Sequence, residues 1–361
     1  MPKILFIAAH RPNRSPSQRF RFEQYLSYFK QNGFDYDFSY LISESDDKIF
    51  YQPGNFFTKL YIFLKSVLKR WNDLLRASEY DIIFVQREAF MTGSTFFEKK
   101  FSRSKAKLVF DFDDAIWHLD ISDANKKFDW LKNPGKTAKI ISFSNAIIAG
   151  NQYLADYAKH HNNNIVIIPT TIDTDEYVKT PSANNNDKIC IGWSGSITTI
   201  KHFEYAVSFL KKVKIKYGDR IEIKVIGDES YRNKELDIKG IAWNKKNELN
   251  ELSSFDIGIM PLPDDEWAKG KCGLKGLQYM ALEIPTIMSP VGVNSEIITD
   301  GENGFLADNE QEWLEKISRL IDSKELREKM GKKARKTVED NYSVHSQKEN
   351  YLHLFKKLLN K

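Results

Sequence analysis

Short apolar runs alternate with segments of helical periodicity along almost the whole chain, and this alternation constrains the fold more than any other feature. Parallel strands need long crossover connections, which are usually helices, so the pattern predicts an α/β protein with parallel sheets between helices. The strands expected in the first half are Ile4–Ala8, Asp81–Val85, Lys107–Phe112, Ala146–Ala149 and Ile165–Ile168. Those expected in the second half are Ile189–Trp193, Ile221–Ile226, Ile257–Met260 and Thr286–Met288.

The series of strands is interrupted by the polar stretch TPSANNND at residues 180–187, which is typical of an exposed linker. A chain of 361 residues is long enough for two domains. We therefore expect an N-terminal domain over 1–178, a linker over 179–187 and a C-terminal domain over 188–344. Doubly wound domains bind ligands at the carboxyl ends of their strands, so the site is expected there.

The most informative segment is GKCGLKGLQYMALEIPTIMSPVGVNSEIITDGENGF, residues 270–305. It predicts a glycine loop, a helix over Leu274–Leu282, the strand Thr286–Met288 and a second glycine loop that opens another helix. Helix N-termini entered through glycine present free N–H groups and a favourable dipole to an anion. Lysines at 269, 271 and 275 surround the first terminus. A ligand that carries phosphate is the simplest occupant.

This segment resembles the donor-binding region of the family 4 (group 1) retaining glycosyltransferases, which have the GT-B fold. Gln278-Tyr279-Met280-Ala281 lies where the family has Glu-Ala-Met-Ala, and Pro285, Gly292 and Glu296 match later elements. Gln278 and Gly270 stand where the family has its two glutamates. The same departure resembles a bacterial branch of the family whose donor loop has the sequences Lys-Cys-Gly and Gln-Tyr-Met. The resemblance implies two Rossmann-like doubly wound domains that face a central cleft. It also implies that the last helix, about 345–361, packs back on the first domain.

The resemblance also implies a donor site in the second half. Gly195 and Lys201 match the family's glycine and lysine, whereas Ser196 replaces its arginine, so Lys271 or Lys275 would supply the second cation for a pyrophosphate. Read alone, the same residues fit a tight turn and a surface lysine. Trp243 is expected near the nucleotide base or in the core. The donor-binding residues expected are Gly195, Ser196, Gly227, Trp243, Lys271, Gly273, Leu274, Gln278 and Glu296.

Carboxylates follow the expected strand Lys107–Phe112, where Asp113 stands at about the position of a histidine that touches the transferred sugar in the family. Three interpretations of Asp113 and Asp114 remain open. They bind sugar hydroxyls, they hold Mg²⁺ or Mn²⁺, or Asp114 caps a helix. His118 is an alternative sugar contact, although a lone histidine is more often structural.

Arginines are concentrated after the first strand, in RPNRSPSQRFR at residues 11–21. This stretch takes the place of a glycine-rich loop in the family, and guanidinium groups bind phosphate bidentately. Arg14, Arg19 and Arg21 are therefore expected to bind acceptor or donor phosphate, with surface charge as the alternative.

Composition narrows the class of protein. A net charge of +5 without a concentrated basic stripe argues against a nucleic-acid protein, and Cys190 and Cys272 are too few for a disulfide framework or zinc site. No signal peptide or membrane span is expected, so we predict a cytoplasmic protein, with the inner membrane face as a possible location. Residues 56–75 fit either a basic amphipathic helix on a membrane or a helix that faces the core.

The function that the resemblance implies is transfer of a sugar, with retention, from a nucleotide-diphosphate sugar to a glycan or lipid-linked acceptor in surface polysaccharide or glycolipid synthesis. Asp113, Asp114, Lys201 and Lys275 are the expected catalytic residues, and no metal or other cofactor is expected. The alternatives are a GT-B sugar-nucleotide epimerase and a non-catalytic nucleotide-sugar-binding subunit. A dinucleotide oxidoreductase is disfavoured because the first strand lacks G-x-G-x-x-G.

Overall fold

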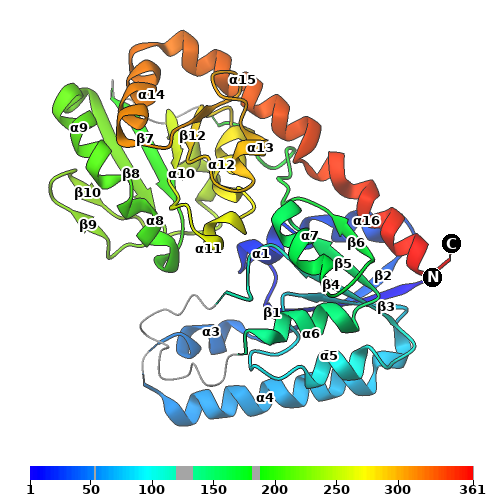
Figure 1. Cartoon of the computed structure of the whole chain (residues 1–361). Coiled ribbons are helices and arrows are strands. Elements are labelled where there is room, and N and C mark those ends of the chain that lie inside the picture. Colours follow the sequence, from blue (N-terminus) through cyan, green and yellow to red (C-terminus); the bar gives the residue numbers. More distant parts are fainter. Residues whose placement is uncertain (53, 119–132, 181–187, 361) are drawn as a thin grey trace. The chain divides into compact units, whose positions relative to one another are not determined.

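A computed structural model describes residues 1–52, 54–118, 133–180 and 188–360. The chain forms two compact units, each with a parallel sheet between helices (Figure 1). The first unit comprises residues 1–170 and 347–361, and the second comprises residues 171–346. The predicted fold class, two Rossmann-like α/β domains, is confirmed. In the described residues, no helix is both long and apolar enough to cross a membrane.

The first unit is built on six parallel strands in the order β2-β1-β3-β4-β5-β6. Its strands are β1 (Lys3–His10), β2 (Asp35–Ile42), β3 (Ile82–Gln86), β4 (Lys107–Phe112), β5 (Ala146–Ala149) and β6 (Ile165–Ile167). Its helices are α1 (Pro16–Arg19), α2 (Leu26–Gln31), α3 (Glu44–Phe50), α4 (Phe56–Leu75), α5 (Phe96–Phe101), α6 (Gly135–Phe143) and α7 (Gln152–Lys159). Strands β3 and β5 are buried along their whole length, which explains why they are continuous apolar runs in the sequence.

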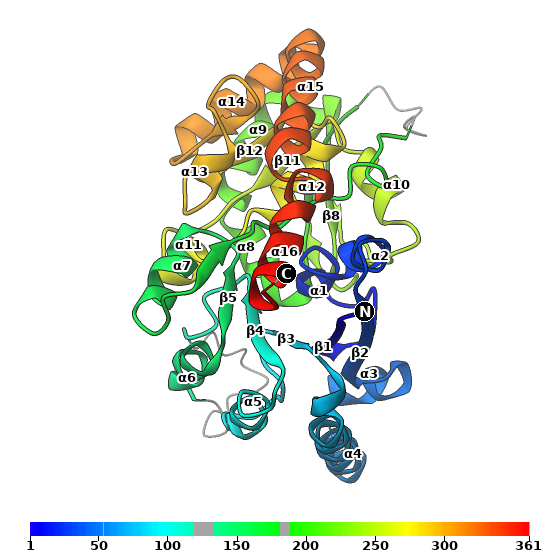
Figure 2. The ribbon, with the colours of Figure 1, turned by 90° about the vertical axis from the view of Figure 1, so that its right-hand side faces the viewer.

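The C-terminal helix α16 (Val344–Leu358) completes the core of the first unit, to which its residues from Gln347 onward belong (Figure 2). The Phe355 ring lies 5.2 Å from the ring of Phe29 and 5.9 Å from that of Phe34. The Tyr351 hydroxyl donates a hydrogen bond of 2.8 Å to the backbone oxygen of Arg21. Segments more than three hundred residues apart in sequence therefore form one aromatic core.

The second unit has five parallel strands in the order β13-β12-β11-β7-β8 and a two-stranded antiparallel hairpin. Its strands are β7 (Ile189–Ser194), β8 (Ile221–Ile226), β9 (Arg232–Asn233), β10 (Ile238–Lys239), β11 (Ile257–Met260), β12 (Thr286–Met288) and β13 (Phe305–Leu306). Its helices are α8 (Ile200–Glu204), α9 (Val207–Tyr217), α10 (Glu248–Ser253), α11 (Glu266–Lys269), α12 (Leu274–Ala281), α13 (Asn294–Ile297), α14 (Glu310–Asp322) and α15 (Lys324–Asn341).

The boundary between the units lies earlier than the sequence suggested. Residues 171–178 belong to the second unit, not to the first, because Ile172 forms a parallel bridge with Ser343 and Tyr177 bonds to Glu248. Residues 181–187 of the expected linker lie outside the described residues.

Candidate functional site

The second unit reverses the direction of its strand order between β7 and β11, and doubly wound folds bind their ligands beyond the strands at such a switch point. Two glycine turns pack closely there. A Cβ on Gly195 would lie 2.1 Å from Cη2 of Trp193, and a Cβ on Gly227 would lie 2.3 Å from the backbone oxygen of Gly195. Gly227 also has a φ of 126°, which side chains rarely allow. Neither position therefore has room for a side chain: Gly195 is packed against the Trp193 side chain, and Gly227 against the backbone of Gly195.

Helix α12 is fixed at the end of β7. The Tyr279 hydroxyl is fully buried and accepts a hydrogen bond of 2.7 Å from the backbone nitrogen of Ser194. Gly273 precedes the helix with a φ of 69°, the left-handed conformation that glycine adopts without strain. The predicted helix Leu274–Leu282 is thus found as Leu274–Ala281, with Leu282 at its cap.

Three predicted lysines act on one buried imidazole. His202 of α8 is 3% exposed, and its pKa is lowered to about 4, first by burial and then by the charges of Lys275, Lys271 and Lys201. Its Nδ1 is buried without a hydrogen-bond partner in the described structure. The Lys275 ammonium also lies 5.5 Å from the centre of the Trp193 ring. Lysines from α8 and from the two sides of Gly273 are therefore gathered at one place.

This arrangement can bind an anion. The first-turn N–H groups of α12 have no partner within the helix, and its dipole is positive at that end. A neutral histidine adds no charge but offers a polar ring nitrogen. The positive charges of the three lysines would attract the phosphates of a bound diphosphate. We call Lys201, His202, Lys271 and Lys275 the lysine cluster.

Sequence reasoning missed His202, although it adjoins Lys201 in the sequence. The available signal was its place on the apolar face of a short helix beside Phe203, which is also buried. The predicted Ser196 lies in the turn before α8, where its backbone nitrogen donates 2.9 Å to Oγ1 of Thr199. Its hydroxyl is 3.0 Å from that of Thr198, so the side chain stabilises the turn.

Gln278 belongs to a buried polar network. Its Nε2 donates to the Tyr177 hydroxyl at 2.9 Å and lies 3.4 Å from Oε1 of Glu248. The same carboxylate accepts from Nε1 of Trp243 at 2.9 Å and, through Oε2, from Tyr177 at 3.1 Å. Trp243 is half-buried, so it is neither a core residue nor a free surface ring. Glu248 was not expected as a site residue, since two of its partners, Gln278 and Tyr177, lie 30 and 71 positions away in sequence.

The remaining predicted donor residues lie around α12. The Lys271 ammonium is 4.6 Å from the centre of the Trp267 ring, and Leu274 is half-buried in the first turn of the helix. Glu296 is exposed on α13. Lys269 is taken up by ion pairs with Glu266 at 2.8 Å and Asp264 at 3.7 Å.

The first unit has its own switch in strand order, between β1 and β3, and polar residues follow both strands and β4. Arg87, directly after β3, binds Asp113 through Nε at 2.8 Å and Asp114 through Nη2. Its φ of 61° is unusual for a residue with a side chain. No helix begins at Asp114 in the described residues up to 118, so the structure does not support the capping interpretation. Arg87 was missed, although its place after a buried strand was a usable signal.

The three arginines expected to bind phosphate have different surroundings. Arg14 binds Asp47 through Nε at 2.6 Å, and Arg11 shares that carboxylate at 2.7 Å. Arg19 is 5% exposed, with its guanidinium over the Phe20 ring.

The expectation for Arg21 is corrected. Its side chain is fully buried and paired with Asp111, and it also donates to the backbone oxygen of Ile168. An arginine held in this way stabilises the core of the first unit and is not accessible to a phosphate.

The family match in the comparison with known proteins lies within the second unit. Residues 173–337 match the family described as "Glycosyl transferases group 1". Spore coat protein SA of Bacillus subtilis is 36% identical over 83 residues, which is 22% of each chain. The capsular polysaccharide biosynthesis glycosyltransferase CapM of Staphylococcus aureus is 27% identical over 168 residues, 44% of this chain and 43% of CapM. The chain therefore aligns with less than half the length of either relative.

The fold is also found in solved structures. HepE from Anabaena, solved in complex with UDP and glucose, superposes with a TM-score of 0.67 over 99% of this chain and 100% of its own, at 13% identity. Such a low identity shows the fold alone. The second unit thus matches the group 1 glycosyl transferases over residues 173–337, and the two parallel-sheet units together have the GT-B fold.

Proposed function

We propose that this protein transfers a sugar, with retention of anomeric configuration, from a nucleotide-diphosphate sugar to a glycan or lipid-linked acceptor. The observation that carries the proposal is the lysine cluster at the N-terminus of α12, beside the Gly195 turn. Three cationic side chains and a helix terminus suit the two phosphates of a nucleotide donor. The name of CapM supports sugar transfer, and the UDP bound to HepE supports a nucleotide donor.

The proposed chemistry needs charge stabilisation more than a nucleophile. As the bond from the anomeric carbon to the diphosphate oxygen breaks, negative charge accumulates on the leaving phosphate. Lys201, Lys275 and the N–H groups that follow Gly273 would stabilise that charge. The leaving phosphate takes the proton of the acceptor hydroxyl, which attacks from the same face. These groups supply the positive charge that a divalent metal supplies in other transferases, so we propose a metal-independent reaction.

Asp113 and Asp114 are proposed to orient the transferred sugar through its hydroxyl groups. Carboxylates accept hydrogen bonds from hydroxyl groups. Arg87 binds the side chains of both Asp113 and Asp114 and so holds the two carboxylates in place. Arg14 and Arg19 are still proposed to bind a phosphate of the acceptor or of the donor. Surface polysaccharide or glycolipid synthesis is proposed as the setting, in view of the capsular and spore-coat relatives.

The test is a panel of nucleotide sugars, with each candidate acceptor, read by release of free nucleoside diphosphate and by NMR of the product. A new glycoside with the anomeric configuration of the donor is expected. An inverted linkage would overturn the retaining mechanism. A changed sugar nucleotide without glycoside would identify an epimerase, and tight nucleotide binding without any product would identify a binding subunit.

A further inference from the structure

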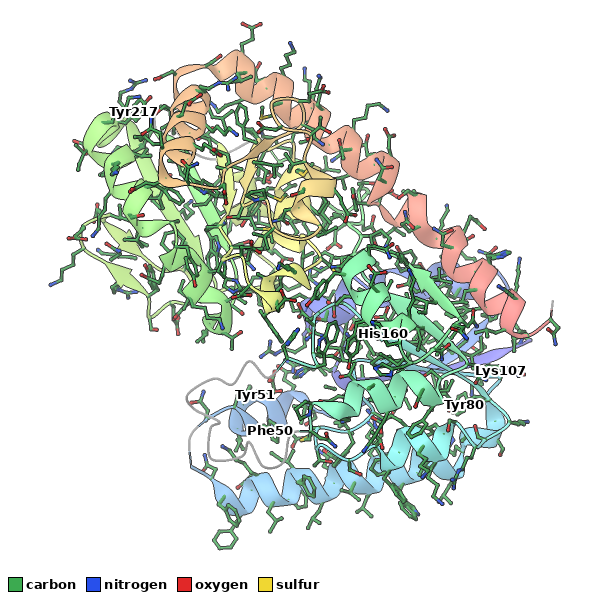
Figure 3. The ribbon with its side chains drawn as sticks, viewed as in Figure 1. Phe50, Tyr51, Tyr80, Lys107, His160 and Tyr217 are labelled. Carbon is green, nitrogen blue, oxygen red and sulfur yellow. The ribbon has the colours of Figure 1, made fainter. Side chains whose placement is uncertain are left out.

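Helix α4 exposes a continuous apolar stripe. Its inner side is buried through Ile62, Ser66, Arg70 and Asp73. The outer face carries large apolar side chains at helical spacing, each at least 44% exposed, and side chains on α4 point away from the sheet in Figure 3. We call this set the outer stripe: Phe57, Leu60, Tyr61, Leu64, Leu68, Trp71 and Leu75. Apolar patches of this extent on a protein surface usually mark a binding face.

Positive charge borders the outer stripe on the side of α5. The Trp71 ring stacks on the Phe96 ring of α5 at 5.7 Å, so the two helices lie side by side (Figure 1). Beyond Phe96 follow exposed cations that we call the basic margin: Lys99, Lys100, Arg103 and Lys105. The lysines on the other flank of α4 are engaged, since Lys65 pairs with Asp46 at 2.7 Å and Lys69 lies over the Tyr40 ring.

Neither α4 nor the segment 96–107 adds an exposed carboxylate to this surface. Residues 56–75 and 96–107 are all described, and they contain two acidic residues. Asp73 is 6% exposed and bound to Arg70, and Glu98 is 0% exposed. The surface formed by α4 and α5 is therefore apolar and cationic together, with Trp71 and Tyr61 as amphipathic rings within it. Such rings favour the boundary between water and lipid.

We propose that the outer stripe and the basic margin bind the surface of a bilayer that contains anionic lipid, with α4 lying in the plane of the interface. The apolar side chains enter the boundary of the acyl chains, while the cations meet the lipid phosphates. The charge argues against a second copy as the occupant, because two stripes packed face to face would bring two basic margins together. The proposal does not rest on sugar transfer, since it concerns the first unit alone.

Vesicle flotation tests the proposal without any nucleotide. The protein should float with vesicles of equal parts phosphatidylcholine and phosphatidylglycerol, much less with phosphatidylcholine alone, and less in high salt. The double variant Leu64→Ser/Leu68→Ser should lower the affinity at least about tenfold, because two exposed leucines lose their burial. Lys99→Ser/Lys100→Ser should lower it by about fivefold for each cation at low salt.

Ile215→Ser is the matched control, because Ile215 is 85% exposed on α9 of the second unit. It should leave flotation unchanged, and all variants should unfold at the same urea concentration as the wild type. Tryptophan emission gives a local readout. Wild type should shift to the blue on the anionic vesicles, and Trp71→Phe, which keeps a ring against Phe96, should remove most of the shift.

The proposal is overturned if wild type does not float with the anionic vesicles, or if the leucine variant floats as wild type does. A dimer in solution that the leucine variant dissociates, with no flotation of either protein, would assign the outer stripe to a second copy instead.

Discussion

At the residue scale, the lysine cluster shows what sequence comparison finds and what it misses. Lys201 and Lys275 were expected from the family resemblance, and the structure brings their charges to one imidazole. His202 was not expected, because its place on an apolar helix face indicates burial but does not reveal the lysines that act on it. Arg21 shows the opposite error. Its partner Asp111 lies ninety positions away, so only the fold reveals the buried pair.

We predict that Lys201→Ala and Lys275→Ala each weaken the binding of a nucleoside diphosphate roughly tenfold to a hundredfold, as expected for loss of a charge-assisted contact. Isothermal calorimetry measures the affinity, and Lys332→Ala, an exposed lysine on α15, serves as control. Binding should also raise the pKa of His202 from about 4, because the ligand neutralises the lysines that lower it. Unchanged affinity in both variants would remove the diphosphate from this site.

A second residue-scale prediction concerns the amide at position 278. A glutamate there would place a second carboxylate about as close to Glu248 as the amide nitrogen is now, 3.4 Å. Gln278→Glu should therefore lower the free energy of unfolding by about 1–3 kcal/mol, since two buried carboxylates repel each other.

The double variant Gln278→Glu/Glu248→Gln should recover most of that loss, because it keeps one amide and one carboxylate in the pair. Urea unfolding of both variants measures the effect. If the double variant is no more stable than Gln278→Glu, the repulsion is not the cause. This network explains in physical terms why glutamine fits a position where the family has glutamate.

At the scale of the elements, the ends of β3 and β4 hold a guanidinium between two carboxylates. We predict that Asp113→Asn lowers kcat more than about tenfold but changes nucleotide affinity less than about twofold, because the carboxylate acts on the sugar. Arg87→Lys should behave similarly, since an ammonium cannot bind both carboxylates in a planar fork. EDTA should have no effect. Recovery of a chelated enzyme by Mn²⁺ would instead support the metal interpretation of the acidic pair.

The sequence predicted most elements of the two sheets but not all. Helix α4 and strand β12 have the expected bounds, because one has a sustained helical period and the other is a bounded apolar run. Strand β2 was missed, because it lies at the sheet edge and carries Asp35 and Asp37 with partly exposed side chains. Strand β13 has two residues, too few for any periodicity. The orientation of α4 was left open, because periodicity does not tell which face meets solvent.

At the scale of the whole molecule, the half-buried His10 and the buried His202 make stability depend on pH. Burial is the first cause that lowers the pKa of both His10 and His202 to about 4. Between pH 6.5 and 4 the unfolded chain therefore binds protons that the folded chain does not, so stability falls as the pH is lowered through this range.

We predict that each histidine lowers the free energy of unfolding by on the order of 1 kcal/mol between neutral pH and pH about 5. Urea unfolding at the two pH values measures it. His10→Gln and His202→Gln should each reduce the pH dependence in the unit that contains the substituted residue. If the free energy of unfolding depends on pH in the variants as it does in the wild type, other groups cause the pH dependence.

The two units should also respond separately to damage in the core. Phe355→Ala removes a fully buried ring from the first unit and should lower its unfolding free energy by about 3–5 kcal/mol, with little change in the transition of the second unit. His353→Ala, exposed on the same helix, is the control. Calorimetry resolves the two transitions, and an equal shift of both would mean that the units unfold together.

The return of α16 to the first unit has a consequence for how the chain matures on the ribosome. Residues 1–170 are translated early, yet their aromatic core lacks Tyr351 and Phe355 until the helix that carries them leaves the exit tunnel. The second unit, residues 171–346, is translated in one continuous stretch, so it can fold before the first unit is finished. During that interval the nascent chain leaves uncovered the faces of Phe29 and Phe34 on which Phe355 later packs. We therefore expect the first unit to close after the second and to be a client of chaperones until then.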